Sequence, residues 1–194
     1  MLGIVLCGGQ SSRMGTDKGL MTYRDKLWAQ LAAERLRALE IPVKLSINPV
    51  QEQAYASYFP QEQLIADHPS LSIKGPLLGV LSAHLLAPDE DLFLLACDML
   101  LIESRLLLQL LGSFTPTATC EAYIFTREGR QEPLCGIYTQ AGLKKILLML
   151  LSQQITKPSM KFVLNHLQVL EIPLKAEDYV SFNNFNSPDE TSKL

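Results

Sequence analysis

The chain has 194 residues, of which 47% are hydrophobic and 19% are charged, a balance typical of a soluble globular protein. This is the length of one ordinary domain, so we expect a single domain over residues 1–194, without disulfide or metal staples. The formal net charge of -3 argues against a broad basic face for nucleic acid, because such binding depends on neutralising phosphates.

The hydrophobic pattern predicts strands that alternate with helices along the chain. In chain order, strands are expected at residues 2–7, 43–47, 64–66 and 92–96, and helices at 27–39, 51–58, 77–86 and 103–111. Beyond Pro116, strands at 120–126 and 134–138 flank a charged loop, and two more helices are expected at 141–151 and 159–167. This alternation predicts an α/β fold with a mostly parallel sheet and helices on both faces.

The apolar segments are short, and the cysteines are scattered. No stretch reaches the roughly 20 apolar residues of a membrane span, and the first apolar segment lacks the features of a signal peptide. The four cysteines form no closely spaced pair, so neither a zinc site nor a disulfide framework is indicated. We therefore expect a cytoplasmic protein with reduced thiols and no membrane association.

The segment from Leu6 to Lys18 leaves the first predicted strand as a glycine-rich loop. Gly8 and Gly9 lack side chains that would block a ligand, and consecutive backbone amides in such a turn can hold phosphate oxygens. Arg13 and Lys18 add positive charge where a triphosphate would concentrate negative charge. The loop predicts a phosphate site, to which the backbone of Leu6 and Cys7 also contributes.

Two familiar phosphate loops do not fit this spacing. The dinucleotide fingerprint requires a glycine where Gln10 stands, and the Walker loop requires glycine and lysine to be adjacent, whereas Gly15 and Lys18 are separated by two residues. The pattern Leu-x-Gly-Gly-x-Ser-x-Arg-Met-Gly-x-Asp-Lys instead resembles the signature of the MobA-like nucleotidyltransferases, the family of molybdenum cofactor guanylyltransferase.

Further landmarks of that family follow in order along almost the whole chain. They are Ile65-Ala66-Asp67, Gly75-Pro76-Leu77-Leu78-Gly79, Cys97-Asp98-Met99, Glu132-Pro133-Leu134, and Asn184-Phe185-Asn186-Ser187-Pro188. Two positions depart from the family pattern, because Leu100 stands where a proline is usual and Ser187 replaces a threonine.

The resemblance implies a Rossmann-like three-layer sandwich of the nucleotide-diphospho-sugar transferase type. It implies transfer of GMP from GTP to the terminal phosphate of molybdopterin, with Mg²⁺ held by Asp98. Asp67, Gly79 and, less securely aligned, Asn48 would contact the nucleotide, and Lys161, Asn184 and Asn186 would face the acceptor. Molybdopterin-synthesis proteins or molybdoenzyme chaperones are the expected partners of a monomer or weak oligomer.

Simpler roles remain open for several of these residues. Asp98 would cap the following helix, Lys161 would be an ordinary exposed lysine, and the segment from Asn186 to Glu190 would cap a last helix. Two alternative functions also remain: a relative that uses CTP or a sugar or alditol phosphate acceptor, and a carrier of molybdenum cofactor that binds nucleotide without turnover.

Overall fold

The computed structural model describes residues 1–8, 17–116, 119–155, 157–185, 187 and 190. The strands are β1 (Leu2–Leu6), β2 (Thr22–Tyr23), β3 (Lys26–Leu27), β4 (Val43–Ile47), β5 (Leu64–Ala66), β6 (Leu92–Ala96), β7 (Ala122–Arg127), β8 (Arg130–Tyr138) and β9 (Val169–Pro173). The α-helices are α1 (Trp28–Arg37), α2 (Glu52–Ala56), α3 (Pro76–Leu86), α4 (Ser104–Ser113), α5 (Gln140–Leu151) and α6 (Met160–Asn165). The 3-10 helices are η1 (Lys18–Leu20), η2 (Pro49–Gln51), η3 (Gln61–Gln63) and η4 (Ala176–Phe182).

Seven strands form one sheet in the order β5-β4-β1-β6-β8-β7-β9, and β2 pairs with β3 in a separate small ribbon. β1 lies parallel to both β4 and β6, whereas β8 runs antiparallel to its neighbours β6 and β7. The mostly parallel α/β sheet expected from the sequence is therefore confirmed. β1, at the centre, delivers the residues that follow it between the ends of β4 and β6.

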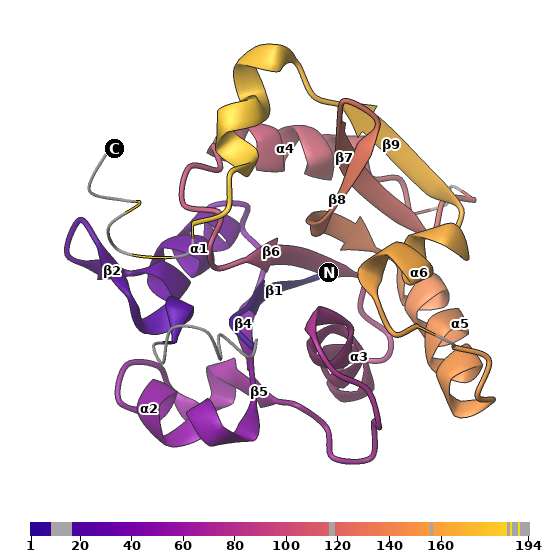
Figure 1. Cartoon of the computed structure of the whole chain (residues 1–194), viewed down its shortest axis with the longest axis horizontal. Helices are drawn as coiled ribbons and strands as arrows, with labels where there is room; N and C mark the ends of the chain where they lie inside the picture. Colours follow the sequence, from indigo (N-terminus) through magenta and orange to yellow (C-terminus); the bar gives the residue numbers. More distant parts are fainter. Residues whose placement is uncertain (9–16, 117–118, 156, 186, 188–189, 191–194) are drawn as a thin grey trace.

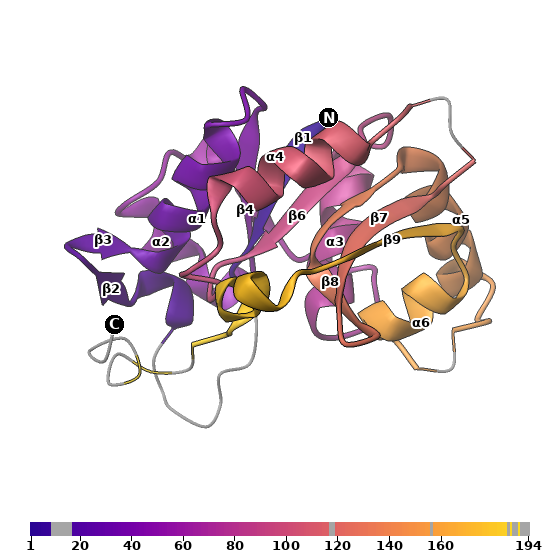
Figure 2. The same ribbon diagram turned by 90° about the horizontal axis from the view of Figure 1, so that it is seen from above.

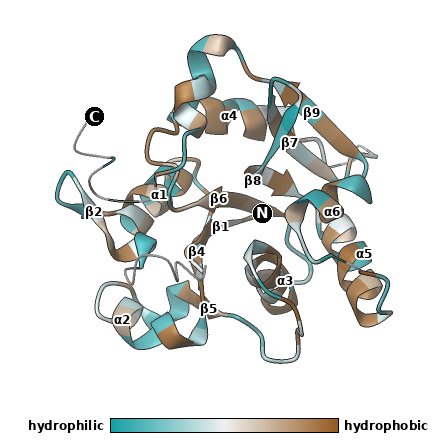
Figure 3. Ribbon diagram, in the orientation of Figure 1, coloured by the Kyte–Doolittle hydropathy of each residue, from teal (hydrophilic) through white to brown (hydrophobic). Residues whose placement is uncertain are grey.

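Helices cover both faces of the sheet (Figure 1). Alternate strand residues point to opposite faces, so Val5 joins a core cluster with α1 and α4, whereas Ile4 joins a second cluster with α3, α5 and α6. α3 is apolar along most of its length (Figure 3), as expected for a helix whose sides are largely buried. In the described part of the chain, no helix has the length and apolarity to cross a bilayer.

The segment expected to be a charged loop is largely a β-hairpin. Glu128 and Gly129 have φ angles of 51° and 73°, the positive values that a tight two-residue turn demands. The charged residues on either side of this turn belong to the strands β7 and β8. Charged side chains are compatible with an antiparallel ribbon that has one face in solvent. The hairpin thus extends past the carboxyl end of β6, on the side of the sheet where η4 also lies (Figure 2).

Several further elements were not expected from the sequence, among them the β2–β3 ribbon, β9 and η4. β9 is an edge strand whose residues are all half-buried or exposed, so it lacks the apolar alternation by which a strand is recognised. η4 follows it and carries the chain back to the carboxyl end of the sheet, where Asn183 and Asn184 come next.

Candidate active site at the carboxyl ends of β1, β4 and β6

The ends of the three central strands bring distant parts of the chain together. Leu6 is in register with Ser46 on one side and Ala96 on the other, so the segments after these strands share one edge of the sheet. Ligands bind at this edge in open α/β sheets. Cys7 and Cys97 are buried here as free thiols, and the pKa of Cys97 is raised by its contact with the Cys7 thiol and by burial.

Lys18 and Asp98 form an ion pair at this edge. The distance from Lys18 Nζ to Asp98 Oδ2 is 3.0 Å, and the side chains are 26% and 17% exposed, so the pair is partly shielded yet open to a ligand. The backbone N–H of Phe185 also donates to the backbone oxygen of Asp98, at 3.1 Å. Asp98 does not cap the next helix, because the N-cap of α4 is Glu103.

The start of the glycine-rich loop is tied to β4. The backbone N–H groups of Cys7 and Gly8 both donate to the backbone oxygen of Ser46, at 2.9 and 3.0 Å. Both amides are therefore engaged in a protein hydrogen bond, and the phosphate contacts expected for the loop backbone from Leu6 to Gly9 stay a prediction. Leu6 lies within β1, with its backbone in the sheet.

Asn48 and Asp67 follow the neighbouring strands β4 and β5, where Ile47 is in register with Ala66. The side-chain oxygen of Asn48 accepts the N–H groups of Val50 and Gln51, at 3.0 and 3.2 Å. The oxygen thus caps η2. The Asp67 carboxyl is half-buried, and burial raises its pKa, as is common at functional sites.

Gly79 lies on the buried side of α3, against β4. A Cβ atom there would stand 2.3 Å from Ser46 Oγ, so close packing between helix and strand explains the glycine. The nucleotide contact expected for Gly79 stays a prediction.

The candidate acceptor residues lie apart in the fold. Asn184 is exposed and directly precedes Phe185, the residue bonded to Asp98. Lys161 is exposed on α6 and lines a hollow of about 310 Å³ with Arg130, Gln131 and Glu171, a lining that includes neither Lys18 nor Asp98. Gly9, Arg13 and Asn186 lie outside the described residues.

Sequence reasoning did not single out Arg127, which joins the hairpin to the segment after η4. Its guanidinium Nε lies 3.5 Å from Glu132 Oε1, and Nη1 donates to Asn183 Oδ1 at 3.2 Å. Burial raises the pKa of Glu132, while Arg127 opposes that shift. The charged stretch of sequence contained both residues, but only the hairpin geometry shows that they pair.

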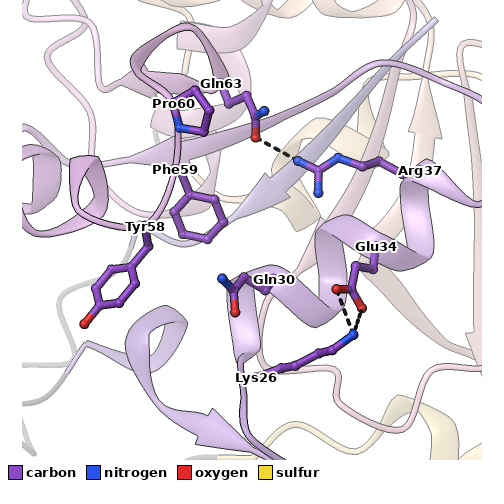
Figure 4. Close-up of a pocket in the computed structure, with 8 residues that line it drawn as sticks. All are labelled: Lys26, Gln30, Glu34, Arg37, Tyr58, Phe59, Pro60 and Gln63. Atoms are coloured by element: carbon purple, nitrogen blue, oxygen red, sulfur yellow. Dashed lines mark hydrogen bonds and ion pairs between the residues drawn. The ribbon is translucent and has the colours of Figure 1, made fainter.

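A second hollow, of about 390 Å³, lies beside α1 (Figure 4). Its lining residues are Lys26, Gln30, Glu34, Arg37, Tyr58, Phe59, Pro60 and Gln63. The Lys26 ammonium is bound by Glu34, and Arg37 donates to Gln63, so the cations that line it have protein partners. None of the described residues expected in the nucleotide site lines this hollow.

Comparisons with known proteins identify the family of the chain. The family model of the MobA-like NTP transferase domain matches residues 3–168. A probable molybdenum cofactor guanylyltransferase of Flavobacterium johnsoniae is 30% identical, covering 98% of this chain and 94% of that protein. One from a Geobacillus species is 29% identical, with coverage of 98% and 95%.

Solved structures share the fold. Molybdopterin-guanine dinucleotide biosynthesis protein A from Archaeoglobus fulgidus superposes with a TM-score of 0.76 at 22% identity, covering 100% of this chain and 96% of that one. The bifunctional IspDF of Campylobacter jejuni gives a TM-score of 0.71 at 13% identity, covering 100% of this chain and 54% of that one. The sheet, the glycine-rich loop and the matched family model together show that this chain belongs to the MobA-like NTP transferase family.

Proposed function

We propose that the chain transfers GMP from GTP to the terminal phosphate of molybdopterin and releases pyrophosphate. The observation that carries this proposal is the Lys18–Asp98 ion pair at the edge of the sheet where β1 and β6 end. Lys18 is the last residue of the glycine-rich loop, and Asp98 follows β6. Relatives of nearly the same length are named molybdenum cofactor guanylyltransferases, which supports the choice of guanine and of the acceptor.

The reaction requires two anions to meet. An oxygen of the acceptor phosphate attacks the α-phosphorus of GTP, the new P–O bond forms, and the bond to the β-phosphate breaks. The attacking phosphate monoester is largely ionised at neutral pH, because its second pKa is about 6. No general base is needed, so the protein must supply positioning and charge neutralisation.

Each group of residues would have one task. Lys18 neutralises phosphate charge, aided by Arg13 and by the loop backbone from Leu6 to Gly9. Asp67 and the side-chain N–H2 of Asn48 orient the nucleoside at the ends of β5 and β4. We assign Lys161, Asn184 and Asn186 to the acceptor. Gly79 would allow close packing of α3 beside the nucleotide.

Asp98 would hold Mg²⁺. Its carboxylate is a hard oxygen donor, is 17% exposed and stands opposite the Lys18 ammonium. Within the described residues there is no group of three His, Cys, Asp or Glu side chains that could hold a metal. The single Asp98 carboxylate suits Mg²⁺, which binds through one or two carboxylates together with substrate phosphates and water. When bound, it would neutralise phosphate oxygens and so lower the repulsion between donor and acceptor.

The proposal includes a cytoplasmic protein in which residues 1–194 act as one catalytic unit, as a monomer or weak oligomer. Its partners would be molybdopterin-synthesis proteins or molybdoenzyme chaperones. These assignments rest on the family to which the chain belongs and on the names of its relatives.

The test is a panel of GTP, CTP, UTP and ATP, incubated with molybdopterin and Mg²⁺, with pyrophosphate release and the mass of the pterin product as readouts. We expect turnover with GTP and a product that contains GMP. Preferred use of CTP, or activity only with a sugar or alditol phosphate, would contradict the proposal. Tight GTP binding without any turnover would instead identify a cofactor carrier.

A further inference from the structure

Asp17 directly precedes Lys18, yet its carboxylate is directed to other partners. Oδ1 accepts the backbone N–H of Gly19 at 2.9 Å and the hydroxyl of Tyr55 at 3.0 Å. Oδ2 accepts the side-chain amide of Gln51 at 2.5 Å. The three donors come from η1, η2 and α2, so they fix the carboxylate from three directions.

Tyr55 is a rigid member of this group. Its side chain is fully buried and its ring stacks on Phe59 with centroids 5.8 Å apart. Burial raises the pKa of Tyr55, and the neighbouring Cys7, Cys97 and Asp17 act in the same direction, so the hydroxyl stays protonated and donates. A Cβ atom on Gly19 would stand 2.0 Å from the Tyr55 oxygen, which shows how closely the backbone after Lys18 packs on this ring.

Gln51 connects the group to the strand ends. Its Nε2 also donates to the backbone oxygen of Cys7 at 3.2 Å, and its Oε1 accepts the backbone N–H of Asn48 at 2.7 Å. One side chain therefore joins the segment after β1, the segment after β4 and Asp17. All of these hydrogen bonds are partly buried, where such bonds hold geometry better than on an open surface.

Lys18 lies between the two residues held in this way. A lysine side chain has several rotatable bonds and loses entropy when its ammonium is confined. Fixing the backbone at Asp17 and Gly19 sets the direction in which the Lys18 side chain leaves the chain, toward Asp98 at 3.0 Å. A small shift at this backbone would move the ammonium away from the position where charge develops.

We propose that Asp17, Gln51 and Tyr55 are positioning residues, which hold Lys18 against Asp98 for nucleotidyl transfer. The inference rests on the function proposed above, since it assigns these residues a role in that reaction. They act through Lys18 and need not touch the nucleotide.

The test is a double-mutant cycle between Tyr55→Phe and Lys18→Ala. Tyr55→Phe removes one hydroxyl and keeps the packed ring, and Tyr58→Phe is the matched control because Tyr58 is 57% exposed. We expect Tyr55→Phe to lower kcat by about tenfold, as for loss of one hydrogen bond to a charged group, with an unchanged KM for molybdopterin. The control should keep wild-type kcat.

The Lys18→Ala background distinguishes positioning from a general structural effect. If Tyr55 acts through Lys18, Tyr55→Phe should lower the residual kcat by less than about twofold there, because coupled residues are not additive. A full tenfold loss in both backgrounds, or an equal loss in the control, would overturn the proposal. Asp17→Asn, which puts an amide N–H2 in place of one of the two accepting oxygens, provides a second variant with the same expected pattern if thermal denaturation shows that Tyr55→Phe folds poorly.

Failure of the proposed function would look different. If the wild-type protein transferred no nucleotide, the same cycle would be followed in the dissociation constant for GTP, measured by calorimetry. There we expect Tyr55→Phe to weaken binding in the wild-type background and not in the Lys18→Ala background. Equal weakening in both backgrounds, or none in either, would overturn the positioning role.

Discussion

Replacement of Gly79 by alanine tests how closely α3 must approach β4. The added Cβ would stand 2.3 Å from Ser46 Oγ, whereas its distances to Ser46 Cβ and Leu6 Cδ2, 3.5 and 3.7 Å, are ordinary contacts. The overlap therefore involves one oxygen atom. It matters for the site because the backbone oxygen of Ser46 accepts the Cys7 and Gly8 amides.

Two effects oppose each other in this variant. Alanine inside a helix is favoured over glycine by about 1 kcal/mol, whereas inserting a methyl group into a packed core costs roughly 1–3 kcal/mol. Ser46 is 1% exposed, so its hydroxyl has little room to move. We expect Gly79→Ala to lower the free energy of unfolding by about 1 kcal/mol, which is roughly 2–4 °C in Tm for a chain of this size.

The assay is thermal and urea denaturation of four proteins: wild type, Gly79→Ala, Ser46→Ala and the double variant. Removal of Ser46 Oγ should relieve the overlap, so the double variant should be more stable than Gly79→Ala by about 1 kcal/mol or more, a coupling of the size seen for residues in contact. The reasoning would be refuted if Gly79→Ala matched or exceeded wild-type stability, or if Ser46→Ala failed to restore it.

Two further predictions concern pH. Burial raises the folded-state pKa of Asp67, so the ionised carboxylate destabilises the folded protein at neutral pH. This destabilisation is lost as pH falls through the folded-state pKa. Asp67→Asn should therefore raise Tm at pH 7 by about 1–2 °C and weaken GTP binding. A gain that persisted unchanged at pH 4 would contradict the assignment to ionisation. The hydrogen bond from Arg105 lowers the pKa of buried Asp178, so this pair stabilises the fold above the unfolded carboxyl pKa of about 4 and loses its contribution as pH falls through the folded value. Arg105→Met should lower Tm at pH 7, with a difference from wild type that shrinks on acidification; a difference independent of pH would exclude the ion pair as its cause.

The sequence predicted the parallel half of the sheet well. The predicted bounds of β4, β5 and β6 agree with the structure because short apolar runs between turn residues identify buried strands. Since the carboxyl ends of parallel strands meet at one edge, the order of motifs also placed Lys18 and Asp98 in a common site.

Other features depended on tertiary structure. β8 was predicted only from Leu134 onward and β9 was not predicted, because their charged or exposed residues hide the period of a strand. The bond between Asp17 and Tyr55 spans 38 residues and requires α2 to sit against η1, which no local pattern encodes. The capture of the Cys7 and Gly8 amides by Ser46 likewise follows from strand register rather than from glycine content.

The most direct test of the proposed site is nucleotidyl transfer by Lys18→Ala and Asp98→Ala, with purified protein, GTP, molybdopterin and Mg²⁺. Each variant should fold with a Tm near that of wild type, because both side chains are partly exposed, yet lose at least about 100-fold in rate through loss of charge stabilisation. Turnover at the wild-type rate in either variant would contradict the assignment of this pair as the centre of the active site.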